Sequence, residues 1–312
     1  MSEQTLKSLP TSADAQPAEL ADRLARVRHI ISDTDATMVT HGCALWDSAG
    51  RPSADLPLAL AGLRRAGVAV VPCTGRNRAM IREDVRLLGL PGWIGEMGGI
   101  LCLHERAQSD WQYFTAQMPY DPVCGMTPHE VILATGVVDR MKERWYDSLE
   151  LYNDNGIGYQ YREVSVAFRG AVMEDEAQRM LDETGLPLYL ADNGFVTRIT
   201  GDTVLPIAAA DDQGRLDAGP TYHITPRGLD KGTAVARYNE LMGRDPAEVM
   251  ACGDSPADCD MAAHVGVFML MRNGVGNPKT QAKLGGIANA VVSSRDATDG
   301  WCDMANLLLA LR

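Results

Sequence analysis

The chain has 312 residues, more than one typical domain of about 100–200 residues, so we expect two domains or one large one. Its residues are 46% hydrophobic and 22% charged, an ordinary globular composition that excludes disorder along the whole chain. Lys and Arg number 29 against 41 Asp and Glu, for a formal net charge of −12. That charge argues against a nucleic-acid-binding protein and against attachment to an anionic membrane surface.

Segments that would direct the protein to a membrane or out of the cell are not recognisable. No apolar run approaches the roughly 18 residues that span a bilayer, and the N-terminus lacks the basic and apolar regions of a signal peptide. The seven cysteines are scattered without Cys-x-x-Cys pairs, which predicts reduced thiols and no zinc site. The sequence predicts a cytoplasmic protein whose partner is a small molecule, and it does not indicate an oligomeric state.

Both ends of the chain alternate short apolar runs with amphipathic helices. Apolar runs that do not alternate in polarity, separated by helices, are typical of βαβ units and of a parallel sheet buried on both faces. We therefore predict an α/β fold with a Rossmann-like parallel sheet core and helices on both faces. The expected strands are residues 29–32, 68–71, 93–94, 100–103, 249–252, 265–271 and 290–292, and the expected helices are 54–65, 77–88, 233–241 and 301–311.

The middle of the chain has a different pattern. Residues 164–168 alternate as in an antiparallel strand, 174–184 form a helical pattern, and 186–190 and 195–199 read as strands on either side of an Asn193-Gly194 turn. Because a single crossover needs only about a dozen residues or somewhat more, a segment of this length predicts an inserted domain. We divide the chain into an N-terminal tail and helix (1–26), the first part of the core (27–107), an α+β cap (108–221) and the second part of the core (222–312).

Acidic residues and a Thr-Gly turn follow the first two strands. Asp33 and Asp35 come directly after one buried strand, and Thr74-Gly75 follows the next. The carboxyl ends of parallel strands face the ligand crevice, where carboxylates can attack, transfer protons or bind a cation. A hydroxyl with backbone N–H groups can hold an anion. Taken alone, each pattern is also that of an ordinary turn.

The C-terminal part adds a lysine and two more acids. Lys231 opens a helix, where its charge opposes the helix dipole unless an anion lies nearby. Asp254 and Asp258 follow a buried strand, four positions apart. Acids from two strand ends would repel each other without a divalent cation, and Mg²⁺ prefers such oxygen ligands. We do not attribute these four features, in this order, to turn residues that happen to be polar.

With these residues the chain resembles the haloacid dehalogenase-like hydrolases, in the branch of mannosyl-3-phosphoglycerate phosphatase, sucrose-phosphate phosphatase and the Cof-type sugar phosphatases. Asp33-Thr34-Asp35-Ala36-Thr37 is similar to the first motif of this family, Thr74 to the second, Lys231 to the third and Gly253-Asp254-Ser255-Pro256-Ala257-Asp258 to the fourth. The branch is suggested by Ile94-Gly95-Glu96 and by 266–273. The resemblance covers about residues 29 to 310.

The resemblance implies a role for each motif residue. Asp33 would be the nucleophile that forms an aspartyl-phosphate, and Asp35 the acid and base. Thr74, Gly75 and Lys231 would hold the phosphoryl oxygens. Mg²⁺ would be held by Asp33, the backbone carbonyl of Asp35 and Asp254, with Asp258 behind them through water or Lys231.

Three positions depart from the family pattern, and several cap residues are further candidates. Ala36 replaces a glycine, and Met97 and Ala257 each stand where relatives often have Asn. The cap candidates for substrate contact are Arg162, Arg169, Arg198 and the Asn193-Gly194 turn, with His41 near the entrance; Trp145, Tyr146 and Tyr152 are expected to pack the cap.

The resemblance implies a Mg²⁺-dependent phosphatase, a phosphoric monoester hydrolase that cleaves a small phosphate ester, expected to be a sugar phosphate. Two alternatives remain open, a phosphomutase with the same motifs and a non-catalytic protein that binds a phosphate ligand. A response-regulator receiver also uses Asp, Thr and Lys at strand ends. The long insertion between Thr74 and Lys231 argues against it.

Overall fold

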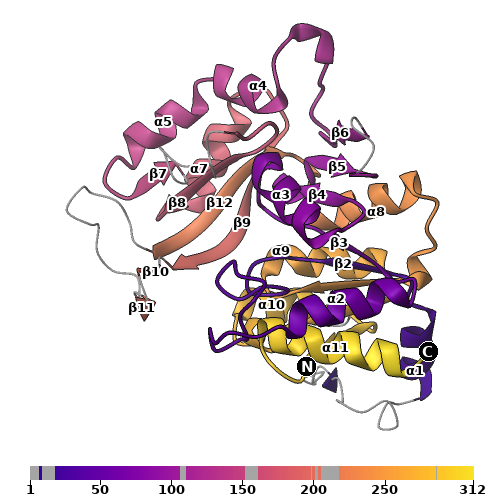
Figure 1. Cartoon of the computed structure of the whole chain (residues 1–312). Coiled ribbons are helices and arrows are strands. Elements are labelled where there is room, and N and C mark those ends of the chain that lie inside the picture. The colour runs from indigo at the N-terminus through magenta and orange to yellow at the C-terminus, as the bar shows by residue number, and fades with distance from the viewer. Residues whose placement is uncertain are drawn as a thin grey trace.

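A parallel sheet forms the centre of the larger domain, as predicted (Figure 1). The structure is a computed structural model that describes residues 7–8, 18–105, 110–151, 161–197, 199–200, 203–204, 218–285 and 287–312. The strand order is β1-β15-β14-β13-β2-β3, with all neighbours parallel. The strands are β1 (Lys7–Ser8), β2 (His29–Ser32), β3 (Ala69–Pro72), β13 (Val249–Gly253), β14 (Val267–Leu270) and β15 (Ala290–Val292).

Helices cover both faces of this sheet, which confirms the predicted α/β class. One face packs on α1 (Ala18–Arg26), α2 (Asp55–Arg65), α3 (Arg78–Leu88) and α11 (Ala297–Ala310). The other packs on α8 (Lys231–Leu241), α9 (Pro256–Cys259) and α10 (Pro278–Leu284). Successive strand residues point to opposite faces, so Ile30 joins the first apolar cluster and Ile31 the second. Both faces are buried, which explains why the strands do not alternate in polarity.

Beside the parallel sheet lies a small antiparallel one, formed by β4 (Trp93–Gly95), β5 (Ile100–Cys102) and β6 (Trp111–Tyr113). The strands expected at 93–94 and 100–103 are present: β4 extends the βαβ pattern, since Ile94 forms a parallel bridge with Cys73, whereas β5 turns back antiparallel to β4. The short helical turn η2 (Glu96–Gly98) reverses the chain between β4 and β5, leaving too few residues for a crossover helix. Further short helical turns are η3 (Pro122–Cys124), η4 (Pro246–Glu248), η5 (Asp260–His264) and η6 (Arg272–Gly274).

The cap is an antiparallel sheet with order β7-β8-β12-β9, backed by helices (Figure 1). Its strands are β7 (Leu149–Leu151), β8 (Val166–Gly170), β9 (Leu188–Thr197) and β12 (Ala218–Pro226), with α4 (Pro128–Ala134), α5 (Val137–Arg144) and α7 (Glu174–Asp182), and with the separate pair β10 (Ile199–Thr200) and β11 (Thr203–Val204). The cap has an apolar core of its own, in which Trp145 is buried as expected. Tyr146 is 82% exposed and does not pack the cap.

Two details of the cap differ from the sequence-based expectations. The predicted turn at Asn193-Gly194 lies inside β9, because β9 pairs with β12 on both sides of it, and these two residues form a β-bulge opposite Thr221. β6 pairs with a core strand and β12 continues to Pro226 in the cap sheet. We therefore infer that the cap begins after β6 and ends with β12, later than the predicted limits 108 and 221.

Among the described residues, no helix has the length and apolar character needed to cross a bilayer. All seven cysteines are free thiols, as predicted. Two of the cap candidates, Arg198 and Tyr152, lie outside the described residues.

Trp301 of α11 joins the last helix to the strand that carries the first motif. Its ring is fully buried in the first cluster, and Nε1 donates to Ser32 Oγ at 3.1 Å. We expect Trp301→Ala to lower the free energy of unfolding by about 3–5 kcal/mol, because it leaves a cavity and removes the hydrogen bond to Ser32 Oγ. Tyr146→Ala, at an exposed aromatic residue, should change it by less than about 0.5 kcal/mol. Chemical denaturation of both variants checks this, and equal effects would contradict it.

Candidate active site

A buried lysine joins two carboxylates at the carboxyl edge of the sheet. Lys231, the first residue of α8, is 2% exposed. Its Nζ lies 2.7 Å from Asp33 Oδ1 and 2.6 Å from Asp258 Oδ1. Asp33 follows β2 and Asp258 lies in α9, just after β13. β2 and β13 are adjacent strands whose chain connections lead in opposite directions, the position where open α/β sheets bind ligands.

The second acid of the fourth motif orders its own turn. Asp258 Oδ2 accepts hydrogen bonds from Asp254 N at 3.1 Å, Ser255 N at 2.8 Å and Ser255 Oγ at 2.6 Å. Gly253 permits this approach, because a Cβ there would lie 2.1 Å from the Asp258 Cβ. Asp258 therefore acts on both sides, holding Lys231 with one oxygen and the backbone of Asp254 with the other.

Asp254 is held by side chains from two other segments. Its Oδ1 accepts from Thr37 Oγ1 at 2.8 Å and its Oδ2 from Asn273 Nδ2 at 3.2 Å. Asn273 Nδ2 also donates to Ala36 O, and its Oδ1 accepts from Ala297 N. Asn273 thus connects the first motif, the fourth motif and the start of α11.

The electrostatics of this cluster follow from burial and proximity. Burial raises the pKa of Asp33 to about 7, with Lys231 opposing the shift and Asp258 adding to it. Burial, then Asp258 and Asp33, raise the pKa of Asp254 well above its usual value. Burial acts to lower the pKa of Lys231, but Asp258 and Asp33 outweigh it and hold that pKa well above its usual value. The ammonium group of Lys231 pairs with more than one carboxylate, so the negative charge in this cluster exceeds the positive charge.

This shortage of positive charge fits a divalent cation. Oxygen atoms of Asp33, Asp254 and Asp258 all lie within 4.8 Å of one another. Mg²⁺ takes hard oxygen ligands of this kind, and it would remove the repulsion that raises the pKa of Asp254. The fourth predicted metal residue, Asp35, was expected to contribute its backbone carbonyl, and its side chain does not join this group.

The Asp35 side chain instead pairs with an arginine that follows the Thr-Gly turn. Arg76 donates to both Asp35 oxygens, from Nε at 2.8 Å and from Nη2 at 2.5 Å. Arg76 Nη1 also donates to Asp84 Oδ2 at 2.5 Å, which fixes the guanidinium between two elements. The Asp35 side chain is 53% exposed, on the open side of the site.

The Thr-Gly turn lies beside these groups and is shaped by η2. Thr74 is buried, its N donates to Ile94 O, and its carbonyl accepts from Met97 N at 3.1 Å. Glu96 N donates to Arg76 O at 2.9 Å. Glu96 and Met97 have φ values of 50° and 61°, a left-handed conformation that suits the Asn expected at position 97 better than Met.

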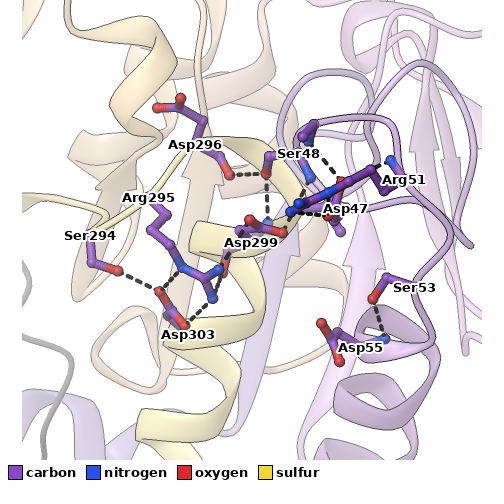
Figure 2. Close-up of polar contacts among 12 residues, drawn as sticks. Asp47, Ser48, Arg51, Ser53, Asp55, Ser294, Arg295, Asp296, Asp299 and Asp303 are labelled. Atoms are coloured by element: carbon purple, nitrogen blue, oxygen red, sulfur yellow. Dashed lines mark hydrogen bonds and ion pairs between the residues drawn. The ribbon is translucent and has the colours of Figure 1, made fainter.

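The loop after the first motif is fastened to the start of α11, as Figure 2 shows. Ser48 Oγ donates to Asp296 O at 2.5 Å and accepts from Asp299 N at 3.0 Å, and Ser48 N donates to Asp299 Oδ1 at 3.2 Å. Arg295, which precedes α11, pairs with Asp299 and Asp303 of that helix. These contacts hold the loop at the edge of the site. His41, expected near the entrance, is exposed in this loop and meets Trp46 edge-on.

The cap reaches the site through Arg162 and through β9 and β12. Arg162 Nη2 donates to Gly75 O at 3.0 Å. A Cβ on Gly75 would lie 3.2 Å from Asn193 Nδ2 and 3.6 Å from His223 Cε1. The candidate Arg169 lies in β8 opposite Thr221, and Ala257 is buried in α9.

The cap is docked by a buried glutamate of the core. Glu96 is fully buried and accepts from the backbone N of Glu163, Val164 and Ser165 at 2.8–3.0 Å, and from Ser165 Oγ at 3.1 Å. Sequence reasoning missed the roles of Arg76, Glu96, Asn273 and His223. Arg76, Glu96 and Asn273 are polar residues in or next to motif segments, a usable signal, whereas nothing in the sequence sets His223 apart.

The fold and this site define a capped α/β protein with four motifs converging on a buried lysine. The family model of haloacid dehalogenase-like hydrolases matches residues 217–294. The chain is 28% identical to a phosphoglycolate phosphatase of Methanoculleus marisnigri over 213 residues, covering 67% of this chain and 71% of the relative. It is 23% identical to another from Methanothrix thermoacetophila, covering 66% and 70%.

Solved structures share the fold across both domains. The protein 0175 of Thermoplasma acidophilum has a TM-score of 0.58 at 17% identity, covering 92% of this chain and 99% of that one. Sucrose-phosphatase from Synechocystis, solved with sucrose and phosphate, has a TM-score of 0.56 at 16% identity, covering 90% and 97%. The predicted resemblance is confirmed. The comparisons support the resemblance to capped haloacid dehalogenase-like hydrolases and the predicted enzyme class, phosphoric monoester hydrolase.

The Arg76–Asp35 pair generates a prediction about turnover. We expect Arg76→Ala to lower kcat about tenfold or more, because Asp35 loses the partner that fixes its position and small misplacements of reacting groups are costly. Arg51→Ala is the matched control, since Arg51 pairs with Asp47 on an exposed loop. Steady-state kinetics on p-nitrophenyl phosphate compares the two, and a normal kcat for Arg76→Ala would refute a positioning role.

The raised pKa of Asp33 predicts how pH affects cation binding. Asp33 titrates near 7 when folded without a cation, against an ordinary value of 3.8, so the folded state binds an extra proton between about pH 4 and 7. Stability of the cation-free protein therefore falls as pH rises through this window. Mg²⁺ competes with that proton, so we expect it to raise the melting temperature more at pH 8 than at pH 5.5.

Thermal unfolding with Mg²⁺ or with EDTA at the two pH values measures this difference. Asp254→Asn serves as the control, because it removes a ligand of the group and should abolish most of the Mg²⁺ shift. An equal Mg²⁺ shift at both pH values would contradict the titration of Asp33.

Proposed function

We propose that this hydrolase is a Mg²⁺-dependent phosphatase that cleaves a small phosphomonoester through an aspartyl-phosphate at Asp33. The observation that carries the proposal is the buried Asp33–Lys231–Asp258 chain beside Asp254. It combines a carboxylate nucleophile, a fixed positive charge and a set of oxygen ligands at one sheet edge. Phosphoryl transfer requires mainly such positioning and charge neutralisation.

Each motif residue then has one task. Asp33 attacks phosphorus, the new bond runs from phosphorus to its carboxylate oxygen, and the bond to the leaving oxygen breaks. Asp35 gives a proton to the leaving oxygen and later takes one from the water that hydrolyses the aspartyl-phosphate. Lys231 and the Thr74-Gly75 turn bind the phosphoryl oxygens.

Asp33, Asp254 and the backbone carbonyl of Asp35 would hold Mg²⁺, with Asp258 behind them through Lys231. When bound, the cation supplies Lewis-acid charge stabilisation at the phosphoryl oxygens. Asp258 and Asn273 keep Asp254 in position for this task.

For the substrate we favour a short, acidic phosphate ester such as phosphoglycolate over the sugar phosphate expected from the motifs. Both relatives described above, which match about two thirds of this chain, are phosphoglycolate phosphatases. The likeness to sucrose-phosphatase is one of fold. The close approach of Asn193 and His223 to Gly75 also leaves little room above the turn. A sugar phosphate remains the comparison substrate.

The experiment is phosphate release from phosphoglycolate, p-nitrophenyl phosphate and glucose 6-phosphate, with Mg²⁺ or with EDTA. We expect Mg²⁺-dependent release that Asp33→Asn reduces by at least about a thousandfold, since the nucleophile is lost. Melting temperature monitors the fold of the variant. Near-normal turnover by Asp33→Asn would refute the nucleophile, and phosphate moved within a sugar without release would indicate a mutase.

A further inference from the structure

Two cap side chains lie directly above the Thr74-Gly75 turn, and we call Asn193 and His223 the cap roof. Asn193 comes from β9 and His223 from its neighbour β12. The atoms of the roof nearest to a Cβ built on Gly75 would be Asn193 Nδ2 at 3.2 Å and His223 Cε1 at 3.6 Å. A leaving group attached to phosphorus at this turn must pass next to the roof.

The hydrogen-bond chain behind the roof determines its donors and acceptors. Ser165 Oγ lies 3.1 Å from Glu96 Oε2, and because a carboxylate only accepts, the Ser165 hydroxyl donates to it. His223 Nδ1 lies 3.3 Å from Ser165 Oγ and therefore carries the proton. Nε2 is left as the acceptor for Asn193 Nδ2, at 3.4 Å.

This assignment leaves one N–H of the Asn193 side-chain amide without a hydrogen-bond partner among the described residues. Its amide nitrogen has two hydrogens, and among the described residues its hydrogen-bond partner is His223. The same nitrogen is the cap atom nearest to a Cβ built on Gly75. The second N–H is therefore available at the catalytic turn, on a side chain whose orientation the core sets through Glu96, Ser165 and His223.

The surroundings of the roof are positive. Arg162 is 7% exposed and its guanidinium donates to both Ser165 Oγ and Gly75 O at 3.0 Å. Burial, then Arg162 and Lys231, hold the pKa of His223 well below its usual value, so the imidazole is neutral. A neutral donor next to a buried guanidinium suits an anionic acceptor oxygen.

We propose that Asn193, oriented by His223, is a specificity-determining residue that donates a hydrogen bond to a carboxylate on the leaving group, so that the enzyme prefers short phosphate esters of hydroxy acids. This inference rests on the phosphatase activity proposed above and extends it to the group that the cap recognises. Glu96 and Ser165 act through His223 and are positioning residues.

The test uses two substrates of similar length, phosphoglycolate with a carboxylate and 2-hydroxyethyl phosphate without one, together with p-nitrophenyl phosphate. Asn193→Asp keeps the shape of the side chain but replaces the donor with a negative charge, and Asn193→Ser is a second, neutral variant. We expect both to lower kcat/KM for phosphoglycolate about tenfold to a hundredfold, mainly through KM. Activity on the other two substrates should change much less.

His223→Asn tests the support of the roof. The shorter amide can keep the bond to Ser165 but cannot reach Asn193, so we expect the same selective loss, smaller in size. His104→Asn, at an exposed histidine, is the matched control. Arg140→Gln on α5 controls for the unit change of cap charge in Asn193→Asp. Both controls should behave as wild type on all three substrates.

The outcomes separate the two proposals. If the wild-type protein releases phosphate from none of the esters, the phosphatase proposal fails and this inference fails with it. If the wild type is active but shows no preference for phosphoglycolate over 2-hydroxyethyl phosphate, recognition of a carboxylate is refuted. If the Asn193 variants lose activity equally on all substrates, or on none, Asn193 does not determine specificity.

Discussion

The burial of Lys231 between two carboxylates is the constraint from which the rest of the site follows. An ammonium group in the interior is stable only when it is paired, and Asp33 and Asp258 supply the partners. The dependence is mutual, because removing one member of a buried ion pair costs about 3–5 kcal/mol. The chain segments that carry the first, third and fourth motifs must therefore meet at one point.

Around this ion-paired lysine, side chains that each bond to two partners fix the rest of the site. Asp258 ties Lys231 to the turn that holds Asp254, and Asn273 ties Asp254 to the loop after the first motif and to α11. Arg76 similarly joins Asp35 to Asp84 of α3. Each carboxylate of the candidate site is thus held by a residue from another element, which leaves it little freedom to adopt other rotamers.

Hydrogen bonds to a buried carboxylate also connect the cap to the core. Glu96 is a buried carboxylate whose charge is balanced by backbone N–H donors and a hydroxyl of the cap segment 163–165. Ser165 in turn hydrogen-bonds His223, and His223 hydrogen-bonds Asn193, so that Glu96 fixes the orientation of these side chains. The orientation of the cap side chains above the Thr74-Gly75 turn is therefore fixed by the core loop that also hydrogen-bonds the backbone of Thr74 and Arg76.

The sequence by itself determined the α/β class and the inserted cap and predicted the motif residues, because buried strands, amphipathic helices and strand-end acids are local patterns. It did not determine the continuity of β9 through Asn193-Gly194 or the exposure of Tyr146, since each depends on whether a distant segment packs there. Only the tertiary structure decided that Asp35 meets Arg76, that Glu96 holds the cap and that His223 faces the site. These contacts join residues far apart in the chain, and no local pattern encodes which pairs will meet.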